Sequence, residues 1–240
     1  MRNVIQYAGK NVWLTVADKL HNQVAQRKVI NRAETPEHYL GYVEPKKTPI
    51  ILIHGYNAPW QKFGIVGDHV SLLGHPVHVI KNLGRNLIDV PSSAKKVRDH
   101  VDMADIKNAV IIAHSKGCLI GKYMLINFNK DNRIIGMVAL AGPFNGTAVA
   151  KLLPFNNVKE LDIDSDLVIS LIRSKEVNSR IISVYPKHDD TIWAEKGSYL
   201  DGALDNIVLN IRGHDNTIFN KESLKVITES VERLSKLFAE

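Results

Sequence analysis

A serine flanked by small residues lies where an apolar run meets a run of helical character. Ala113-His114-Ser115-Lys116-Gly117 follows the apolar residues 109–112 and leads into residues 118–128. Small residues two positions before and two after a serine let a strand and a helix approach closely through a sharp turn. Such a turn exposes the hydroxyl and aims the first helical N–H groups at whatever it attacks. The pattern predicts a nucleophilic Ser115; the alternative is a serine that only begins a helix.

A nucleophilic serine needs a general base, and His214 is the candidate. A hydroxyl reacts poorly near neutral pH unless a histidine accepts its proton and a carboxylate orients that histidine. His214 follows Gly213 after a predicted strand at 207–211, and it precedes the last predicted helix. We therefore predict His214 as the base. The alternative is a surface-loop histidine, one of ten histidines in the chain.

Two neighbouring aspartates could supply the carboxylate. Asp189 and Asp190 follow a predicted strand at 180–185, and the next two residues, Thr191 and Ile192, suggest a return to the core. Adjacent residues on one loop face different ways, so the sequence alone cannot separate the two. We predict Asp190 because it directly precedes these two residues, with Asp189 as its rival.

The oxyanion formed during attack on a carbonyl needs N–H donors. One candidate is the backbone of Lys116, directly after the serine, and the other is the backbone of Tyr56. Tyr56 follows His54-Gly55 at the end of the first predicted strand, where Gly55 lets the chain turn. The alternative for His54-Gly55 is an ordinary corner between a strand and a loop.

From residue 49 the chain alternates strands with helices, which predicts a mostly parallel, doubly wound α/β sheet. Several strands are nearly continuous apolar runs, as in buried parallel strands. The predicted strands are 50–53, 77–81, 109–113, 134–140, 180–185 and 207–211, and the predicted helices are 92–104, 116–128 and 222–238. Ligands of such sheets bind beyond the carboxyl ends of the strands.

Two segments lie outside this alternation. Residues 1–48 are predicted as a helical extension and a link, because apolar residues recur every fourth position from Val4 to Val24. That face predicts docking on the body or, alternatively, a peripheral membrane or dimer contact. Residues 142–179 carry no strand pattern, and 161–172 are predicted as helical. This second segment is a candidate cap within a hydrolase-like domain at 49–240.

The composition argues against several kinds of site and partner. The 240 residues fit one α/β domain, and a single cysteine, Cys118, excludes an intrachain disulfide. The net charge is +6, but basic residues do not cluster with aromatic ones, so we expect no nucleic-acid partner. The chain shows no glycine-rich phosphate loop and no complete metal-ligand pattern, so we expect neither cofactor nor metal. Without a visible signal peptide or membrane span, we expect a cytoplasmic protein.

Together these residues resemble the α/β-hydrolase superfamily, specifically its small bacterial lipase-like serine esterases, over about residues 48–240. Four motifs are similar to those of minimal bacterial lipases. They are the serine motif with alanine as its first residue, His54-Gly55-Tyr56, Asp190-Thr191-Ile192 and Gly213-His214. Residues 141–147 and 161–167 also resemble two stretches of true lipases. Three features depart from the pattern: Phe144 replaces a histidine, Lys116 replaces Met, Gln or Leu, and the first 48 residues have no counterpart.

The resemblance implies hydrolysis of carboxylic esters through an acyl-enzyme on Ser115. The same residues are compatible with a thioesterase, a phospholipid deacylase or a weakly catalytic binding module. The expected substrate is a small-molecule or lipid ester. Its acyl chain would lie among apolar side chains near these loops: Trp60, Phe144, Leu152, Leu153, Trp193 and Phe219.

Overall fold

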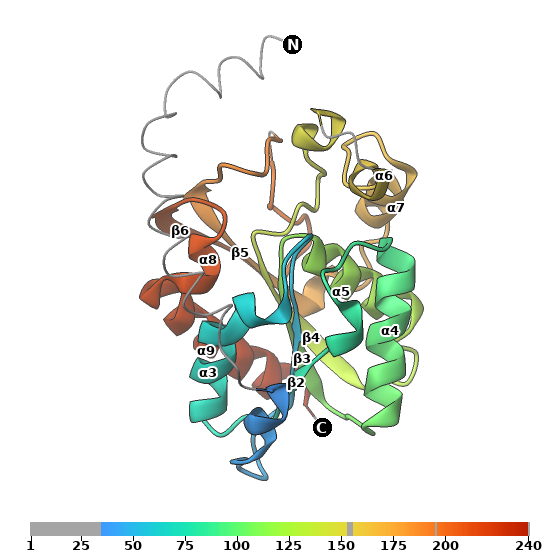
Figure 1. Cartoon of the computed structure of the whole chain (residues 1–240). Coiled ribbons are helices and arrows are strands. Elements are labelled where there is room, and N and C mark those ends of the chain that lie inside the picture. Colours follow the sequence, from blue (N-terminus) through green and yellow to red (C-terminus); the bar gives the residue numbers. More distant parts are fainter. Residues whose placement is uncertain (1–34, 153–155, 195, 240) are drawn as a thin grey trace.

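A six-stranded parallel sheet with helices on both faces forms the body of the protein (Figure 1). The computed structural model describes residues 35–152, 156–194 and 196–239. The strand order is β2-β1-β3-β4-β5-β6, and every neighbouring pair is parallel. The strands are β1 (Ile50–Ile53), β2 (Val77–Val79), β3 (Ala109–His114), β4 (Ile134–Leu140), β5 (Ile181–His188) and β6 (Asp205–Arg212).

Helices α4 and α5 cover one face of the sheet, and α3, α8 and α9 lie on the other (Figure 1). The longer helices are α3 (Gly64–Leu72), α4 (Val90–Met103), α5 (Lys116–Asn127), α7 (Asp166–Arg173) and α9 (Lys221–Phe238), with the single turns α6 (Asn156–Lys159) and α8 (Asn216–Phe219). Short 3-10 helices are η1 (Pro36–Leu40), η2 (Trp60–Phe63), η3 (Lys81–Leu83), η4 (Ala148–Leu152) and η5 (Asn178–Arg180).

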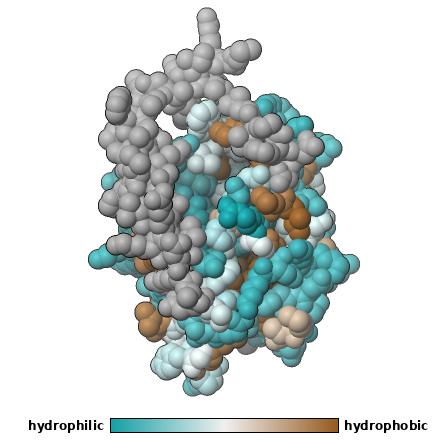
Figure 2. Space-filling view, viewed as in Figure 1, coloured by the Kyte–Doolittle hydropathy of each residue, from teal (hydrophilic) through white to brown (hydrophobic). Residues whose placement is uncertain are grey.

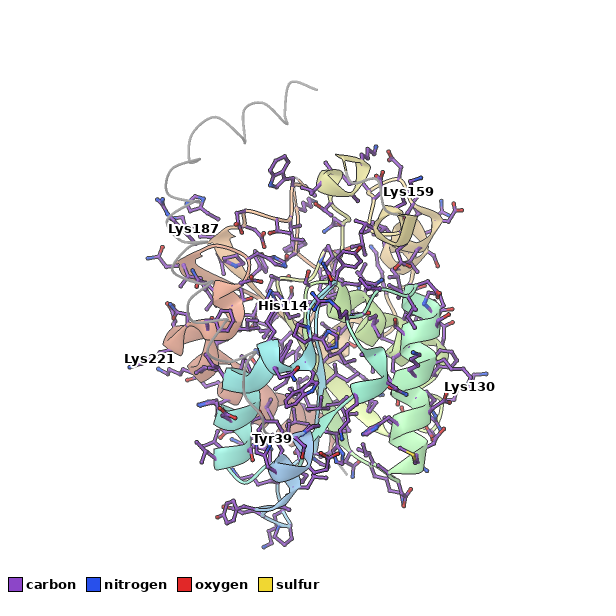
Figure 3. All side chains as sticks on the ribbon, viewed as in Figure 1. Tyr39, His114, Lys130, Lys159, Lys187 and Lys221 are labelled. Carbon is purple, nitrogen blue, oxygen red and sulfur yellow. The ribbon has the colours of Figure 1, made fainter. Side chains whose placement is uncertain are left out.

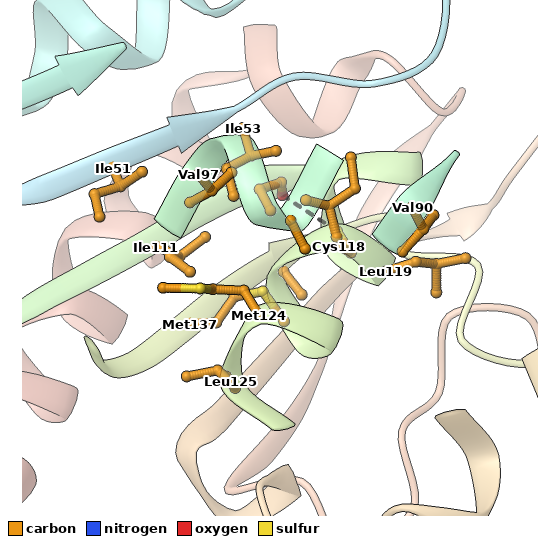
Figure 4. Close-up of a cluster of buried hydrophobic side chains, with 14 of the residues drawn as sticks. Ile51, Ile53, Val90, Val97, Ile111, Cys118, Leu119, Met124, Leu125 and Met137 are labelled. Carbon is orange, nitrogen blue, oxygen red and sulfur yellow. Dashed lines mark hydrogen bonds between the residues drawn. The ribbon is translucent and has the colours of Figure 1, made fainter. Parts of the chain in front are cut away.

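The sheet separates two hydrophobic cores because successive side chains of a strand point to opposite faces. In β1, Ile51 and Ile53 pack in the core beside α4 and α5, whereas Ile50 and Leu52 pack on the other face. Figure 4 shows part of the first core, which contains Ile51 and Ile53 of β1 and Cys118 of α5. Every residue of β3 and β4 is buried. Burial on both faces explains why these strands are continuous apolar runs rather than alternating ones.

Polar side chains define where three helices begin. Asp89 accepts a hydrogen bond from the backbone of Ser92 at the start of α4, with an oxygen–nitrogen distance of 2.7 Å. Ser165 and Asn220 cap α7 and α9 in the same way. These contacts satisfy N–H groups that have no acceptor within the helix.

The predicted sheet is confirmed, with all six strands present and all of them parallel. Strands 50–53 and 134–140 match the structure residue for residue, and the other boundaries differ by one to three residues. Helix α3 was not predicted, because Gly64 and Gly67 interrupt its apolar pattern. Gly67 is required there by packing: a Cβ atom would lie 2.7 Å from the hydroxyl oxygen of the buried Tyr39.

The structure describes only part of the two segments, 1–48 and 142–179, that lie outside the alternating strands and helices. The predicted N-terminal helix falls on residues 1–34, outside the described residues, so its docking, membrane or dimer role stays a prediction. The following link packs on the body, since the Tyr39 hydroxyl donates to Asp68 of α3 at 3.0 Å. Between β4 and β5 the described residues form η4, α6, α7 and η5, with α6 and α7 near the carboxyl end of the sheet (Figure 1). We call residues 142–179 the cap segment.

Hydrophobic side chains reach the surface in several separate places on the face in Figure 2, which is otherwise mostly hydrophilic. Of the large apolar side chains that the structure describes, Leu72 and Met103 are the most exposed, at 82% and 80%. Among the described residues, no helix combines the length and the apolar character needed to span a membrane. The cytoplasmic location stays a prediction.

The contact between α5 and β1 can be tested with two glycines of the same helix. A Cβ atom on Gly117 would collide with the backbone carbonyl of Ile53, whereas one on Gly121 would meet the side-chain sulfur of Met137. Backbone cannot move aside as a side chain can, so we expect Gly117→Ala to lower the free energy of unfolding by about 1–3 kcal/mol or more. Gly121→Ala should cost less. Urea denaturation measures both, and an equal or smaller loss for Gly117→Ala would contradict the close contact.

Candidate functional site

Ser115 lies at the junction of β3 and α5 in a strained backbone conformation. Its φ is 56° and its ψ is −127°, a region that L-residues rarely occupy and that costs on the order of 1–3 kcal/mol. The junction is held by its backbone: the Ser115 N–H donates to Leu140 O at 3.0 Å, and the Ser115 carbonyl accepts from Cys118 N at 2.9 Å. Ser115 stays partly exposed between the buried His114 and Lys116. The predicted strand–serine–helix turn is therefore present.

Glycines make room for this turn. A Cβ atom on Gly55 would lie 3.0 Å from the Cβ of Ser115, and one on Gly117 would lie 3.0 Å from the carbonyl oxygen of His54. The loop after β1 and the start of α5 therefore approach each other more closely than larger residues would allow. This places Tyr56 and Lys116, the two predicted oxyanion donors, on adjacent segments.

Asp189, not Asp190, holds the imidazole of His214. The Nδ1 atom of His214 lies 2.9 Å from a carboxylate oxygen of Asp189. The other oxygen of Asp189 accepts the backbone N–H groups of Thr191 and Ile192, each at 2.8 Å. These four groups form a buried cluster, since the side chains of His214 and Asp189 are only 7% and 12% exposed.

The prediction that Asp190 orients the ring is wrong. The Asp190 carboxylate instead accepts the backbone N–H of His214 at 2.8 Å. The two aspartates face different ways, as expected for adjacent loop residues, and both hold the same histidine. One orients the His214 ring and the other fixes the His214 backbone.

The environment of His214 favours its protonated form. Burial alone would lower the pKa of His214, but the charge and hydrogen bond of Asp189 outweigh it and raise that pKa above its usual 6.5. Burial likewise opposes the charge of Asp189, yet His214 and the two backbone N–H donors hold its pKa below the usual range. The Nε2 atom of His214 is buried and makes no hydrogen bond within the described part of the chain. That nitrogen is the one available for proton transfer.

A second histidine, His114, lies beside the base. It directly precedes Ser115, and its ring centroid lies 4.6 Å from that of His214. Figure 3 shows His114 near the centre of the molecule. Burial lowers the pKa of His114 to about 3, so it is neutral near pH 7. His114 was not predicted as part of the site, although its place beside the serine is evident in the sequence.

Asp215 and Lys62 form an ion pair next to the two histidines. Their charged atoms are 2.8 Å apart, and Asp215 also lies 3.9 Å from the Nε2 of His114. Although burial opposes the charge, the positive charge of Lys62 contributes most to lowering the pKa of Asp215 to about 2. The pair is distant in the sequence and was not predicted.

Polar contacts fasten the loop that carries Tyr56. The buried Asn86 donates from its amide to the carbonyl of His54 at 2.7 Å, and Arg85 donates to the carbonyl of Asn57 at 2.8 Å. Lys116 occupies the first position of α5, where an N–H has no acceptor within the helix. The oxyanion roles of Tyr56 and Lys116 stay predictions that this arrangement is consistent with.

The cap segment is attached to the loop that carries Asp189. The Thr147 hydroxyl donates to the carbonyl of Thr191 at 3.1 Å and accepts the backbone N–H of Trp193 at 3.2 Å. Thr147 therefore links the chain after β4 to the loop after β5.

The predicted pocket residues are spread over the two faces of the sheet. Phe144 is buried in the core beside α5, whereas Trp60 and Phe219 pack against the core of the other face. The indole N–H of Trp193 donates to the carbonyl of Asp190 at 3.1 Å. The side chain of Leu152 and all of Leu153 lie outside the described residues. The acyl pocket stays a prediction.

No group of three potential metal-ligating side chains gathers in the described residues. The one cysteine, Cys118, is buried, and burial raises the pKa of its thiol. Its sulfur lies 3.3 Å from the carbonyl oxygen of Ala113 (Figure 4). Cys118 therefore belongs to the core, as its position in the helix suggested.

Comparison with known proteins identifies the fold. No protein-family model matches the sequence, and no curated protein matches it. Among solved structures, the mature Bacillus licheniformis lipase BlEst2 is similar over 79% of this chain and 94% of its own, with a TM-score of 0.63 and 16% identity. MGS-MChE2, an α/β-hydrolase from a lagoon-sediment metagenome, is similar over 78% and 92%, with a TM-score of 0.60 and 16% identity.

A third similar structure is an extracellular α/β-hydrolase from a Paenibacillus species. It is described as sharing structural and functional homology with tobacco salicylic acid binding protein 2. The similarity spans 80% of this chain and all of the other, with a TM-score of 0.53 and 16% identity. At these identities the comparisons establish the architecture alone.

The two aspartates can be distinguished by titrating His214. NMR of isotopically labelled histidines should give a pKa above 6.5 for His214, whose signal is assigned by its loss in His214→Asn. Asp189→Asn removes the charge that raises this pKa, and the remaining burial should bring it below 6.5. Asp190→Asn is the matched control, because its amide oxygen can still accept the His214 backbone N–H. An equal shift in both variants would contradict the assignment.

Proposed function

Because the chain has the α/β-hydrolase fold, we propose that it is a serine hydrolase that cleaves carboxylic esters through Ser115, His214 and Asp189. The observation that carries this proposal is the buried bond between His214 Nδ1 and Asp189. It leaves Nε2 available, and the ring of His114, the residue before the strained serine, lies 4.6 Å from that of His214. Nucleophile (Ser115), orienting acid (Asp189) and base (His214) follow one another along the chain in the order expected for this fold.

In the first half of the reaction, the Ser115 oxygen attacks the acyl carbon of the ester while His214 Nε2 takes the hydroxyl proton. The imidazole becomes positively charged, and the Asp189 carboxylate stabilises it. Asp189 also holds the proton on Nδ1, so that Nε2 is the basic nitrogen. His214 then donates its new proton to the leaving alcohol, and an acyl group remains on Ser115.

In the second half, water takes the place of the serine hydroxyl. His214 accepts a proton from the water as it attacks the acyl carbon, and then returns that proton to the Ser115 oxygen. The backbone N–H groups of Tyr56 and Lys116 stabilise the oxyanion in both halves. The close approach of Gly55 to Ser115 supports this placement.

The substrate class is a small-molecule or lipid ester, and a thioester or phospholipid would react by the same chemistry. The second candidate function is that of a binding module with weak turnover. The Paenibacillus structure favours it, because that protein is described in relation to a salicylic acid binding protein. Slow turnover combined with tight retention of a hydrolysed ligand would identify this second function.

Hydrolysis of p-nitrophenyl esters of increasing acyl length tests the activity. We expect Ser115→Ala to lower turnover by about 10⁴-fold or more, because the nucleophile is lost. Ser71→Ala, in the last turn of α3, is the control and should match the wild type. If the wild type is no faster than Ser115→Ala on any ester, ester hydrolysis fails and the binding module takes its place.

The pH dependence of kcat/KM tests the base. His214 must be neutral to accept a proton, and its pKa is raised. Activity should therefore be low in acid and rise with pH through a midpoint above 6.5. Asp190→Asn should leave that midpoint in place. A midpoint clearly below 6.5 in the wild type would contradict His214 as a base paired with Asp189.

A further inference from the structure

The side chain of Lys116 is fully buried, although its backbone alone is needed at the position after the serine. Its ammonium group donates to the carbonyl of Ile88 at 2.6 Å and lies 2.7 Å from a carboxylate oxygen of Glu160. A lysine is rarely buried without a paired charge. Glu160 supplies that charge, and its side chain is itself only 15% exposed.

Glu160 connects this lysine to two further elements. Its second carboxylate oxygen accepts the backbone N–H of Val90 at the start of α4, at 3.0 Å. Its carbonyl accepts the hydroxyl of Ser165, the residue that caps α7, at 2.7 Å. Glu160 follows α6, so the ion pair joins the cap segment to the first residue of α5.

The same ammonium group faces the loop after β1. It lies 5.7 Å from the centre of the Tyr56 ring, within the range of a cation–π contact. Lys116 therefore contacts the segment of one proposed oxyanion donor with its side chain and carries the other donor on its backbone.

We propose that Lys116 and Glu160 are positioning residues whose buried ion pair ties the cap segment to the two oxyanion donors. The proposal rests on the proposed function. When Glu160 holds the ammonium group, Lys116 is fixed against Tyr56, and both N–H groups keep the geometry that the oxyanion needs. When the pair is broken, the unpaired charge must find another partner, and the loop after β1 shifts with it.

Three variants test the pair: Glu160→Gln, Lys116→Met and the double variant. Glu160→Gln keeps an acceptor for Val90 N but removes the charge, and Lys116→Met keeps the length of the side chain. Loss of a whole oxyanion donor costs roughly 10²–10³-fold in kcat, so displaced donors should cost about 10- to 100-fold. KM for p-nitrophenyl esters should change little, because the effect lies in the transition state.

The double variant shows whether Lys116 and Glu160 affect kcat together, as a pair, or independently of each other. Removing both charges leaves no unpaired charge in the interior, so its loss in kcat should be smaller than the product of the two single losses. Lys95→Met is the control, since Lys95 also pairs with a carboxylate, Asp99, but on the exposed side of α4. It should leave kcat unchanged.

Hydrogen exchange supplies a readout that does not require activity. The Glu160→Gln substitution lies in the cap segment, and it should speed hydrogen exchange of the backbone amides at 55–57 in the loop after β1. Thermal unfolding is measured beside it. A lower melting temperature with unchanged kcat and unchanged exchange at 55–57 would show a purely structural pair and overturn the proposal. If the wild type has no Ser115-dependent turnover, the proposed function fails, and the exchange at 55–57 alone decides whether the coupling exists.

Discussion

The strained backbone at Ser115 is the constraint on which the rest of the site depends. A residue with φ of 56° and ψ of −127° persists only where its surroundings hold it. Here β3 ends in a hydrogen bond to β4, and Gly55 and Gly117 let the loop after β1 and α5 close around the turn. The stability of the fully buried central strands β3 and β4 therefore offsets the local strain. The serine is presented at the point of the sheet where the strand order reverses between β1 and β3.

Charges around this turn are arranged in two separate groups. Asp189 and His214 form one, and Lys62 and Asp215 form the other, with the neutral His114 between them. Because burial weakens solvent screening, the charge of Asp189 acts strongly on His214, whereas burial outweighs the effect of Asp215 on His114 and keeps that ring neutral. Near pH 7, the first group keeps His214 oriented and basic. The second places a compensating positive charge, Lys62, next to Asp215.

The fold was more predictable from the sequence than the site. Strands such as 134–140 are buried on both faces, and a continuous apolar run carries that information locally. Ser115 and His214 were found because each follows a strand with a glycine nearby. Asp190 was predicted in place of Asp189, since the direction of a loop side chain depends on tertiary contacts that the sequence does not carry. Glu160 had no local signal at all, because its partner lies 44 residues earlier in the chain.

The order of the strands also determines when the site can exist. Ser115 and its turn are complete once β1, β3 and β4 have paired, which uses residues up to Leu140. Asp189 and His214 follow β5 and β6 and arrive only with the last quarter of the chain. During synthesis, the growing chain therefore carries a serine with neither its base nor its acid. A chain cut before β5 would contain the serine and lack the groups that could use it.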